Sequence, residues 1–284
     1  MQSQEDKCPY CSAPLKALSL TCPACQESLG FPNVRLSSSP AEIAALAERL
    51  QYAEEEAKIN GIESEFKNLI QEVDHISGVV IALSVEVALQ IVSNDTSQYV
   101  GYERLVGAGV RTPAEFANDA HRKIVAGALF GSFGGDIIYG ALSLSERGLR
   151  TYGEIYCRLK NVAIKNRTSF LDENSYDYFE KYGEHGEIGH KSNWADKAKL
   201  TAIKLMNNKQ IKKGSTPDEW EKLVLICDGK NRKLDEFIEA HIYGAINCYS
   251  VESLTAAIPI DSSKSILIEA VIDAFNAARL SKAK

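Results

Sequence analysis

Two closely spaced pairs of cysteines stand near the start of this 284-residue chain. Cys8 and Cys11 form the first pair, Cys22 and Cys25 the second, and ten residues separate the pairs. Each C-x2-C turn presents two thiolates to one tetrahedral ion, and so short a segment has too little core to fold without a metal. The spacing predicts a zinc ribbon over residues 1–31, with iron and a redox dithiol as alternatives. Four protein ligands make such an ion structural.

The predicted ribbon carries little basic charge. The segment contains two basic residues, Lys7 and Lys16, and three acidic ones, Glu5, Asp6 and Glu27. The sequence therefore does not favour direct phosphate binding by the ribbon alone. Docking of a protein partner, binding of nucleic acid and simple capping of the chain end remain open as its roles.

Composition indicates an ordinary folded protein. Apolar residues make up 45% of the chain, charged residues 25%, and the formal net charge is -6, which excludes a polycationic chain. The start of the chain is polar, and no apolar run reaches the roughly 18 to 20 residues of a membrane span. We therefore expect a cytoplasmic protein with no membrane partner. The other three cysteines lie in apolar stretches and predict no disulfide framework: Cys157, Cys227 and Cys248.

Residues 32–77 read as a helical connector. Ser39 is a good N-cap and Pro40 suits the first helical position, so a helix is expected over 41–60. After Gly61 a second helical pattern continues to Val73. The pattern fits two helices or one bent helix.

Residues 78–284 predict a mixed α+β body. Residues 78–84 form either a buried strand or the start of a helix that continues to residue 92. Helices are expected over 111–128, capped by Thr112 and Pro113, and over 263–280. Aromatic and β-branched residues predict strands over 137–144, 152–159, 167–170 and 237–243.

The body contains one acidic residue in an apolar strand-like run. Glu239 has His241 two positions later, on the same face of the predicted strand. A carboxylate in such a run must be paired, solvated in a cleft or catalytic. Tyr-Gly pairs begin at Tyr139, Tyr152 and Tyr243, where a ligand can approach the glycine and stack on the tyrosine. The usual nucleotide motifs, among them the P-loop and the G-x-G-x-x-G turn, are missing from the sequence.

A series of short motifs spans roughly residues 95–260. Its members are Tyr139-Gly-Ala-Leu142, Tyr152-Gly153, Arg167-Thr-Ser-Phe170, Asn174-Ser175, Phe237-Ile-Glu-Ala-His-Ile-Tyr-Gly244 and Val251-Glu-Ser-Leu254. In this order the series resembles the ADP-ribosyltransferase-type domains of bacterial toxins, in particular a branch with the motifs YGAL, YG, RTTF, DS and YIEAQVHG. The resemblance implies an ADP-ribosyltransferase-like split β-sheet core with flanking helices, preceded here by the ribbon and the connector.

The resemblance also implies a function and a site. Glu239 would orient the ribose of NAD and support the positive charge that develops as nicotinamide leaves. The NAD cleft would be lined by residues matching the family motifs: Tyr139, Gly140, Tyr152, Thr168 and Ser169. Such chemistry needs a fixed anion beside developing positive charge and an oriented acceptor, and no metal.

The sequence departs from the family pattern at two places. The first strand shows no convincing Arg or His to anchor NAD, which leaves Arg104, Arg111 and Arg122 as candidates. Phe237 stands where these enzymes often carry a specificity Glu or Gln, which disfavours arginine as the acceptor.

The function expected is an NAD-dependent ADP-ribosyltransferase, a toxin or anti-phage defence effector. Whether an antitoxin or chaperone partner restrains it is left open by the sequence. RNA is the leading acceptor and a protein side chain the second, because Phe237 replaces the specificity residue and residues 181–213 are rich in lysine around Trp194. A solvated lysine face is the simpler interpretation of that segment. NAD hydrolysis, with water as acceptor, would use the same site.

A non-catalytic zinc-ribbon module that binds nucleic acid or protein is the alternative from another functional class. Glu239 would then be an ion-paired structural residue, with Glu236 as the acid most easily mistaken for it. Tyr139 and Tyr152 would pack on a sheet, and His241 is interpreted as structural in either case.

Overall fold

A seven-stranded antiparallel sheet organises the computed structural model, which describes residues 7–8, 10–16, 19–107, 117–260 and 263–282. The strand order is β5-β4-β8-β2-β1-β3-β9, and β6 and β7 form a separate two-stranded sheet. The strands are β1 Gly78–Leu83, β2 Ile137–Ser143, β3 Ile155–Leu159, β4 Thr168–Leu171, β5 Lys191–Asn193, β6 Leu225–Ile226, β7 Glu236–Phe237, β8 Glu239–Tyr243 and β9 Val251–Ala256. The predicted mixed α+β class is confirmed.

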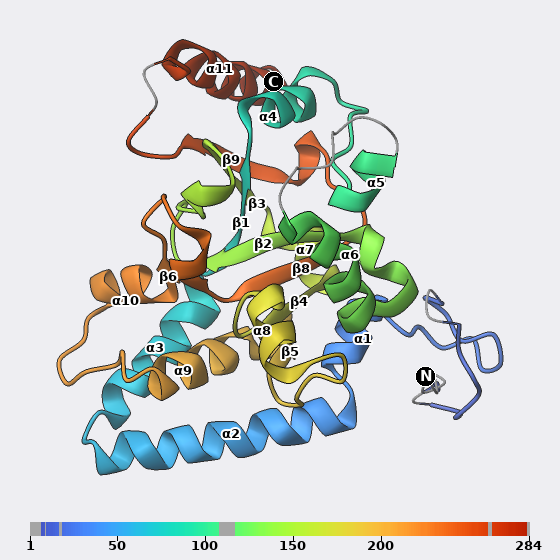
Figure 1. Cartoon of the computed structure of the whole chain (residues 1–284), viewed down its shortest axis with the longest axis vertical. Helices are drawn as coiled ribbons and strands as arrows, with labels where there is room; N and C mark the ends of the chain where they lie inside the picture. The colour runs from blue at the N-terminus through green and yellow to red at the C-terminus, as the bar shows by residue number, and fades with distance from the viewer. Residues whose placement is uncertain (1–6, 9, 17–18, 108–116, 261–262, 283–284) are drawn as a thin grey trace.

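The large sheet divides between β1 and β2. These strands pair only where residues 78–80 face residues 143–141, after which β1 pairs with β3 along residues 80–83. In Figure 1, β1 runs steeply upward while β2 and β8 cross the view. The two halves of the sheet therefore diverge beyond this short contact.

Helices cover both halves of the sheet (Figure 1). On the β8 half, α2 and α3 pack against α9, while α1 contacts β4 and β8 and α6 packs against α8. On the β1 half, α4 packs against α11 and β3. The helices are α1 Pro32–Ser37, α2 Pro40–Ile59, α3 Glu63–Ile76, α4 Val85–Ser93, α5 Tyr102–Gly107, α6 Ala117–Phe130, α7 Asn161–Ile164, α8 Ser175–Tyr182, α9 Lys197–Asn207, α10 Pro217–Val224 and α11 Ser265–Lys282. Within the described ranges, none of the helices has the length and apolarity needed to cross a bilayer.

Local capping explains where the first helices begin. The Ser39 side chain accepts a hydrogen bond from the Glu42 backbone N at 3.3 Å, as expected of an N-cap before Pro40. Gly61, with φ +66°, separates α2 from α3, so the predicted pattern forms two helices. Ser84 caps α4 by accepting from Val87 N at 3.4 Å. Residues 78–92 are therefore a strand followed by a helix.

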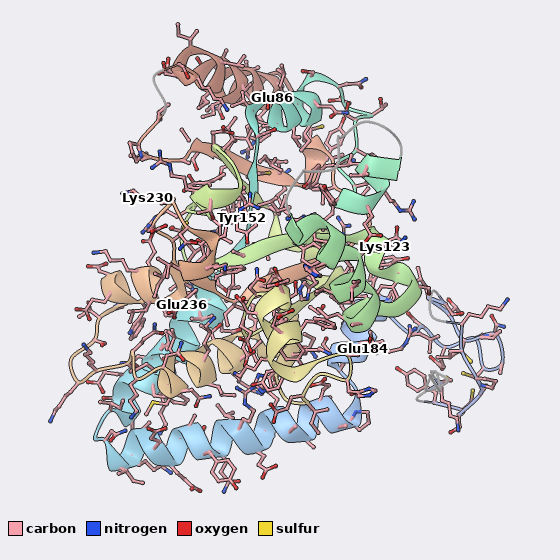
Figure 2. All side chains as sticks on the ribbon, viewed as in Figure 1. Glu86, Lys123, Tyr152, Glu184, Lys230 and Glu236 are labelled. Atoms are coloured by element: carbon pink, nitrogen blue, oxygen red, sulfur yellow. The ribbon has the colours of Figure 1, made fainter. Side chains whose placement is uncertain are left out.

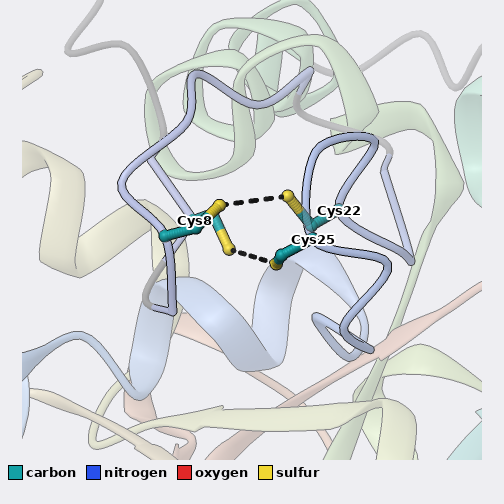
Figure 3. Close-up of side chains that lie close together, drawn as sticks. Cys8, Cys22 and Cys25 are labelled. Atoms are coloured by element: carbon teal, nitrogen blue, oxygen red, sulfur yellow. Dashed lines mark hydrogen bonds between the residues drawn. The ribbon is translucent and has the colours of Figure 1, made fainter.

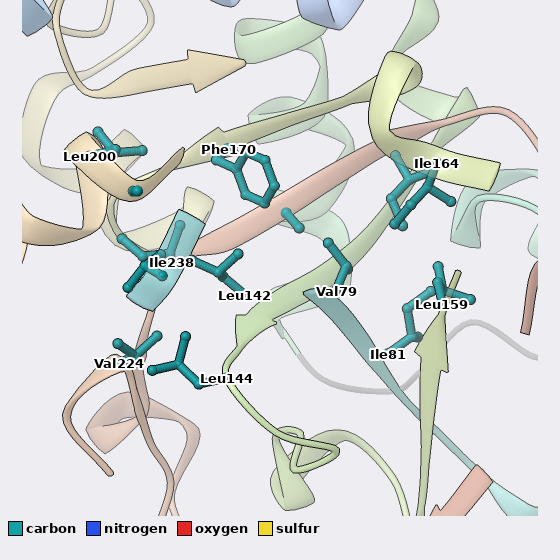
Figure 4. Packing of buried hydrophobic residues seen from close by; sticks show 14 of the residues in the cluster. Val79, Ile81, Leu142, Leu144, Leu159, Ile164, Phe170, Leu200, Val224 and Ile238 are labelled. Carbon is teal, nitrogen blue, oxygen red and sulfur yellow. The ribbon is translucent and has the colours of Figure 1, made fainter. Parts of the chain in front are cut away.

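The segment predicted as a connector contributes to the main hydrophobic core. Ala57, Phe66 and Leu69 are at most 1% exposed and belong to the same cluster as the strand residues Val79 and Leu142. Figure 4 shows Val79, Leu142 and other members of this cluster packed between the strands and helices. Helices α2 and α3 are thus integral to the body.

Two predicted strands have different bounds in the structure. Tyr152 ends a 3₁₀ turn that begins at Arg150, and β3 starts only at Ile155. The run 237–243 divides at Ile238, because Phe237 pairs with β6 in the small sheet while β8 begins at Glu239. Strands β5, β6 and β9 were not predicted from the sequence. Thr112 and Pro113 lie outside the described residues, and α6 runs from Ala117 to Phe130.

Candidate functional site

The four N-terminal cysteines come together in two similar turns. Cys8 O accepts from Ser12 N at 2.9 Å, and Cys22 O accepts from Gln26 N at 3.0 Å. Ser12 and Gln26, each directly after the second cysteine of its pair, have φ of +60° and +63°. The two halves of the ribbon therefore repeat one local conformation.

The cysteine geometry suits a tetrahedral metal. The Sγ atoms of Cys8 and Cys25 are 3.7 Å apart, those of Cys11 and Cys22 are 3.6 Å apart, and all four lie within 4.8 Å of one another (Figure 3). Zinc with Zn–S bonds of about 2.3 Å separates tetrahedral sulfur ligands by about 3.8 Å. Backbone hydrogen bonds, first that of Cys25, lower the pKa of Cys22 to about 6, whereas burial and the neighbouring cysteine side chains raise the pKa of Cys25 to about 12. The cluster could bind a metal such as zinc.

Glu239 begins the central strand β8 and is only 5% exposed. Its Oε2 accepts a hydrogen bond from the backbone N of Ser175 at 3.0 Å and contacts His241 Nε2 at 2.8 Å. Ser175 is the first residue of α8, where backbone N–H groups lack partners within the helix and the helix dipole favours an anion. The buried carboxylate is thus held by an amide and an imidazole.

Tyr139 lies on the same face of the sheet as Glu239. It pairs in register with His241, whose ring it contacts edge-on with centroids 5.4 Å apart. Phe130 contacts the His241 ring with centroids 4.9 Å apart. Burial and the negative charge of Glu239 raise the pKa of Tyr139, so its hydroxyl stays neutral.

Tyr152 lies in the turn before β3 and packs against the cluster that contains Ala141, the strand partner of Glu239. Burial and the charge of Glu239 raise the pKa of Tyr152 to about 12. The Arg232 guanidinium lies over the Tyr152 ring, 4.4 Å from its centroid, and Figure 2 shows Tyr152 near the segment that carries Lys230. The negative charge of Glu239 therefore acts on both Tyr139 and Tyr152.

The other predicted cleft residues have different positions. Ser169 is on the Glu239 face, opposite His241, and accepts from Asn33 Nδ2 at 3.2 Å. Thr168 points to the opposite face, is fully buried and donates to Ile164 O at 2.8 Å. A Cβ at Gly140 would lie 2.9 Å from Val79 Cγ1, so this glycine permits close packing of β2 on β1. The structure groups Ser169, but not Thr168 or Gly140, with Glu239.

Of the three candidate NAD anchors, Arg122 is electrostatically linked to the tyrosines. Its positive charge partly offsets the raised pKa of both Tyr139 and Tyr152, and it lies over the Tyr102 ring, 4.8 Å from the centroid. Arg104 forms an ion pair with Asp136, and Arg111 lies outside the described residues.

Phe237 and Glu236 lie in the small sheet. Phe237 packs in one cluster with Ala141, the strand partner of Glu239, and with Tyr152. Phe237 is 2% exposed, and its backbone O accepts from Lys204 Nζ at 2.7 Å. Glu236 is exposed and accepts from Asn208 Nδ2 at 3.4 Å and Gln210 Nε2 at 3.3 Å. Glu239, rather than Glu236, is therefore the acid of the central sheet.

The lysine-rich segment does not present its lysines as one surface. Lys197 is 2% exposed and contacts Asp74, Lys191 faces the buried Glu42, and Lys204 bonds to a backbone carbonyl. Trp194 packs against Phe170, which belongs to the main core. This segment gives no support to a basic platform for nucleic acid.

A second buried polar cluster ties α2 to β4 and β5. His190 Nδ1 lies 2.8 Å from Asp172 Oδ2, and Arg49 Nη2 donates to the same oxygen at 2.9 Å. Glu42 Oε2 accepts from Gly189 N at 2.6 Å. Asp172, Glu173 and His190 lie close enough to hold an ion, but His190 and Arg49 already compensate Asp172. The cluster is a structural connection.

Two cavities of about 210 Å³ each lie elsewhere, between α4, α5 and the ends of β2 and β8. Gln98 lines both, and the second includes Arg104, Asp136 and Tyr243. Neither is lined by Glu239.

The roles of the Ser175 amide and the Asn33 side chain were not predicted from the sequence, and His241, which contacts Glu239, was interpreted as structural. His241 stands two positions from Glu239 on the same strand face, and this spacing is the signal that could have identified it. No family model matches the chain, and no curated protein matches its sequence.

Proposed function

We propose that the protein is an NAD-dependent ADP-ribosyltransferase with Glu239 as its catalytic carboxylate. The observation that carries the proposal is the Glu239 carboxylate, held on an interior strand by Ser175 N and His241 Nε2, with Tyr139 on the same face of the sheet. A buried anion held by two partners, with aromatic rings near it, suits stabilisation of a cation in a site shielded from water.

The reaction follows from that arrangement. The bond between ribose C1′ and nicotinamide breaks, and its electron pair leaves with the nicotinamide, which becomes neutral. Positive charge grows on the ribose, and the Glu239 carboxylate stabilises it. A lone pair of the acceptor then bonds to C1′ and the acceptor loses a proton. Tyr139 or Tyr152 would stack on the nicotinamide ring.

We assign zinc to the four-cysteine cluster. Cys8, Cys11, Cys22 and Cys25 would hold one ion with no open position, so the metal stabilises the ribbon and takes no part in the reaction. The proposed acceptor is RNA, with a protein side chain second. The apolar Phe237, buried just before β8, supports this order because it offers no polar contact to an arginine. The proposed restraint by an antitoxin or chaperone rests on the resemblance to toxins alone.

The test compares Glu239→Gln with Glu236→Gln, the same substitution at an exposed acid in the neighbouring sheet. Each purified protein is incubated with labelled NAD and separate pools of RNA, DNA and protein, and both nicotinamide release and label transfer are followed. We expect Glu239→Gln to lower nicotinamide release by about 100-fold to 1000-fold, because the fixed charge is lost. Glu236→Gln should match the wild type.

Each outcome identifies a function. Label that enters RNA and is lost in Glu239→Gln establishes the transferase and its acceptor. Release without transfer identifies an NAD hydrolase. The non-catalytic binding module is favoured by one observation, that the contacts of Glu239 Oε2 also suit a buried structural acid. No release from the wild type in any pool would select that alternative.

A further inference from the structure

Asn33 is a polar residue buried at the junction of the ribbon and the body. It lies in α1 and is 1% exposed. Its Nδ2 donates to Arg167 O at 3.1 Å, to Ser169 Oγ at 3.2 Å and to His241 O at 2.8 Å. The Asn33 amide thus bonds to Ser169 in β4 and to His241 in β8. His241 is the residue whose side chain contacts Glu239.

The orientation of the Asn33 amide is fixed by its partners. Two of the three acceptors are backbone carbonyls, which cannot donate to an oxygen. Asn33 Oδ1 is buried and has no hydrogen-bond partner in the described part of the chain. A carboxylate here would place an oxygen against the carbonyls of Arg167 and His241. The position therefore requires a donor, and aspartate is an isosteric substitution that removes it.

Helix α1 is also attached to the ribbon. Arg35 Nη1 donates to Ser19 O at 3.1 Å, within the segment that joins the two cysteine pairs. Phe31, just before α1, contacts the Tyr243 ring at the end of β8 with centroids 5.7 Å apart. Figure 1 shows α1 between the N-terminal segment and the strands β4 and β5. One short helix therefore contacts both the ribbon and β8.

We propose that Asn33 is a positioning residue for the catalytic carboxylate. By holding the backbone of His241 it sets where the imidazole lies, and the imidazole in turn fixes Glu239 Oε2. The metal-bound ribbon keeps α1 in place, so metal in the ribbon acts on the site from a distance. The kinetic consequence rests on the proposed function, whereas the structural link does not.

The test compares Asn33→Asp with Asn161→Asp. Asn161 is a matched control because its Nδ2 donates to a backbone carbonyl, that of Ser77 at 3.2 Å, and its Oδ1 is also buried without a partner. It contacts the residue before β1 rather than β8. The ¹⁵N resonances of the His241 ring report its hydrogen bonding, and steady-state kinetics give kcat and KM for nicotinamide release.

We expect Asn33→Asp to shift the His241 ring resonances and to lower kcat by about 10-fold with KM for NAD unchanged. Asn161→Asp should leave the resonances and kcat as in the wild type. Removing the metal from the wild type with a chelator should shift the His241 resonances in the same direction as Asn33→Asp.

Unchanged His241 resonances in both Asn33→Asp and the metal-free protein would overturn the proposal. Shifted resonances without any wild-type nicotinamide release would retain the structural link while rejecting the proposed function. Equal loss of kcat in the two variants would show a general effect of destabilisation and would also overturn it.

Discussion

Glu239 and Asp172 are buried carboxylates stabilised by different partners. Glu239 contacts a backbone amide and an imidazole, whereas Asp172 lies between Arg49 and His190. Burial alone would raise the pKa of Asp172, but the hydrogen bond from His190 and the charges of His190 and Arg49 outweigh it and lower the pKa below 3.8. Asp172 therefore stabilises the folded state mainly in its ionised form.

A pH-dependent loss of stability follows for Asp172. Because its folded-state pKa lies below the ordinary value, its contribution is present above about pH 4 and is lost as the pH falls through the folded pKa. Asp172→Asn should lower the free energy of unfolding by about 3 kcal/mol at pH 7, with a smaller difference in acid. Urea unfolding of the wild type and the variant at pH 7 and in acid measures the two differences in free energy. Glu63→Gln, at an exposed ion pair, is the control. A difference that does not change with pH would contradict the role of charge.

Sequence patterns identified the acid of the site but not the groups that hold it. Glu239 was predicted because a carboxylate in an apolar strand needs a partner, and Tyr139 and Ser169 do lie on its face of the sheet. The imidazole of His241 was interpreted as structural because a single histidine without a nearby Cys or Asp is more often a satisfied core or cleft residue than a ligand. Ser175 and Asn33 are 64 and 208 residues from their partners on β8. Contacts at that separation follow from the strand order, which a single sequence does not give.

At the scale of elements, Gly140 determines how closely β2 approaches β1. An added Cβ would lie 2.9 Å from Val79 Cγ1 and 3.1 Å from Val80 O, where the two strands share their short contact. Gly140→Ala should therefore lower the free energy of unfolding by about 1 to 3 kcal/mol. Gly127→Ala is the control, because Gly127 lies in α6 with nothing within 4 Å of its added Cβ. It should stabilise by about 0.5 to 1 kcal/mol. Denaturant unfolding measures the change in the free energy of unfolding for each variant. A Gly140→Ala protein as stable as the wild type would contradict the role of Gly140 in packing.

Element types were more predictable than their bounds. The N-cap Ser39 and the strand content of residues 137–144 depend on local chemistry, which a sequence displays directly. The end of β7 and the start of β8 depend on which neighbour each backbone group bonds, and no local pattern marks the division at Ile238. The three-residue β5 is too short to show a period.

At the scale of the molecule, the ribbon and the helical segment behave differently. Cys8, Cys22 and Leu29 form a cluster of their own, separate from the main core to which α2 and α3 contribute. A chain beginning at residue 32 should therefore fold. A chain beginning at residue 78 would lose Phe66, Leu69 and Val73, worth about 5 to 8 kcal/mol, which is comparable to the whole stability of a domain. Urea unfolding followed by circular dichroism tests both truncated chains. Cooperative folding of the chain that begins at residue 78 would contradict the conclusion that α2 and α3 are part of the main core.

The strand that carries Glu239 lies in the interior of the large sheet and is synthesised after both of its neighbours. β8 lies between β4 and β2, and both of these precede it in sequence. Until residue 243 has emerged, β2 and β4 expose the edges that β8 will join, and such edges can pair with other chains. A nascent chain therefore does not hold the Glu239 carboxylate in place when β2 and β4 have already been synthesised. Its folding depends on contacts distant in sequence, which are slow to form.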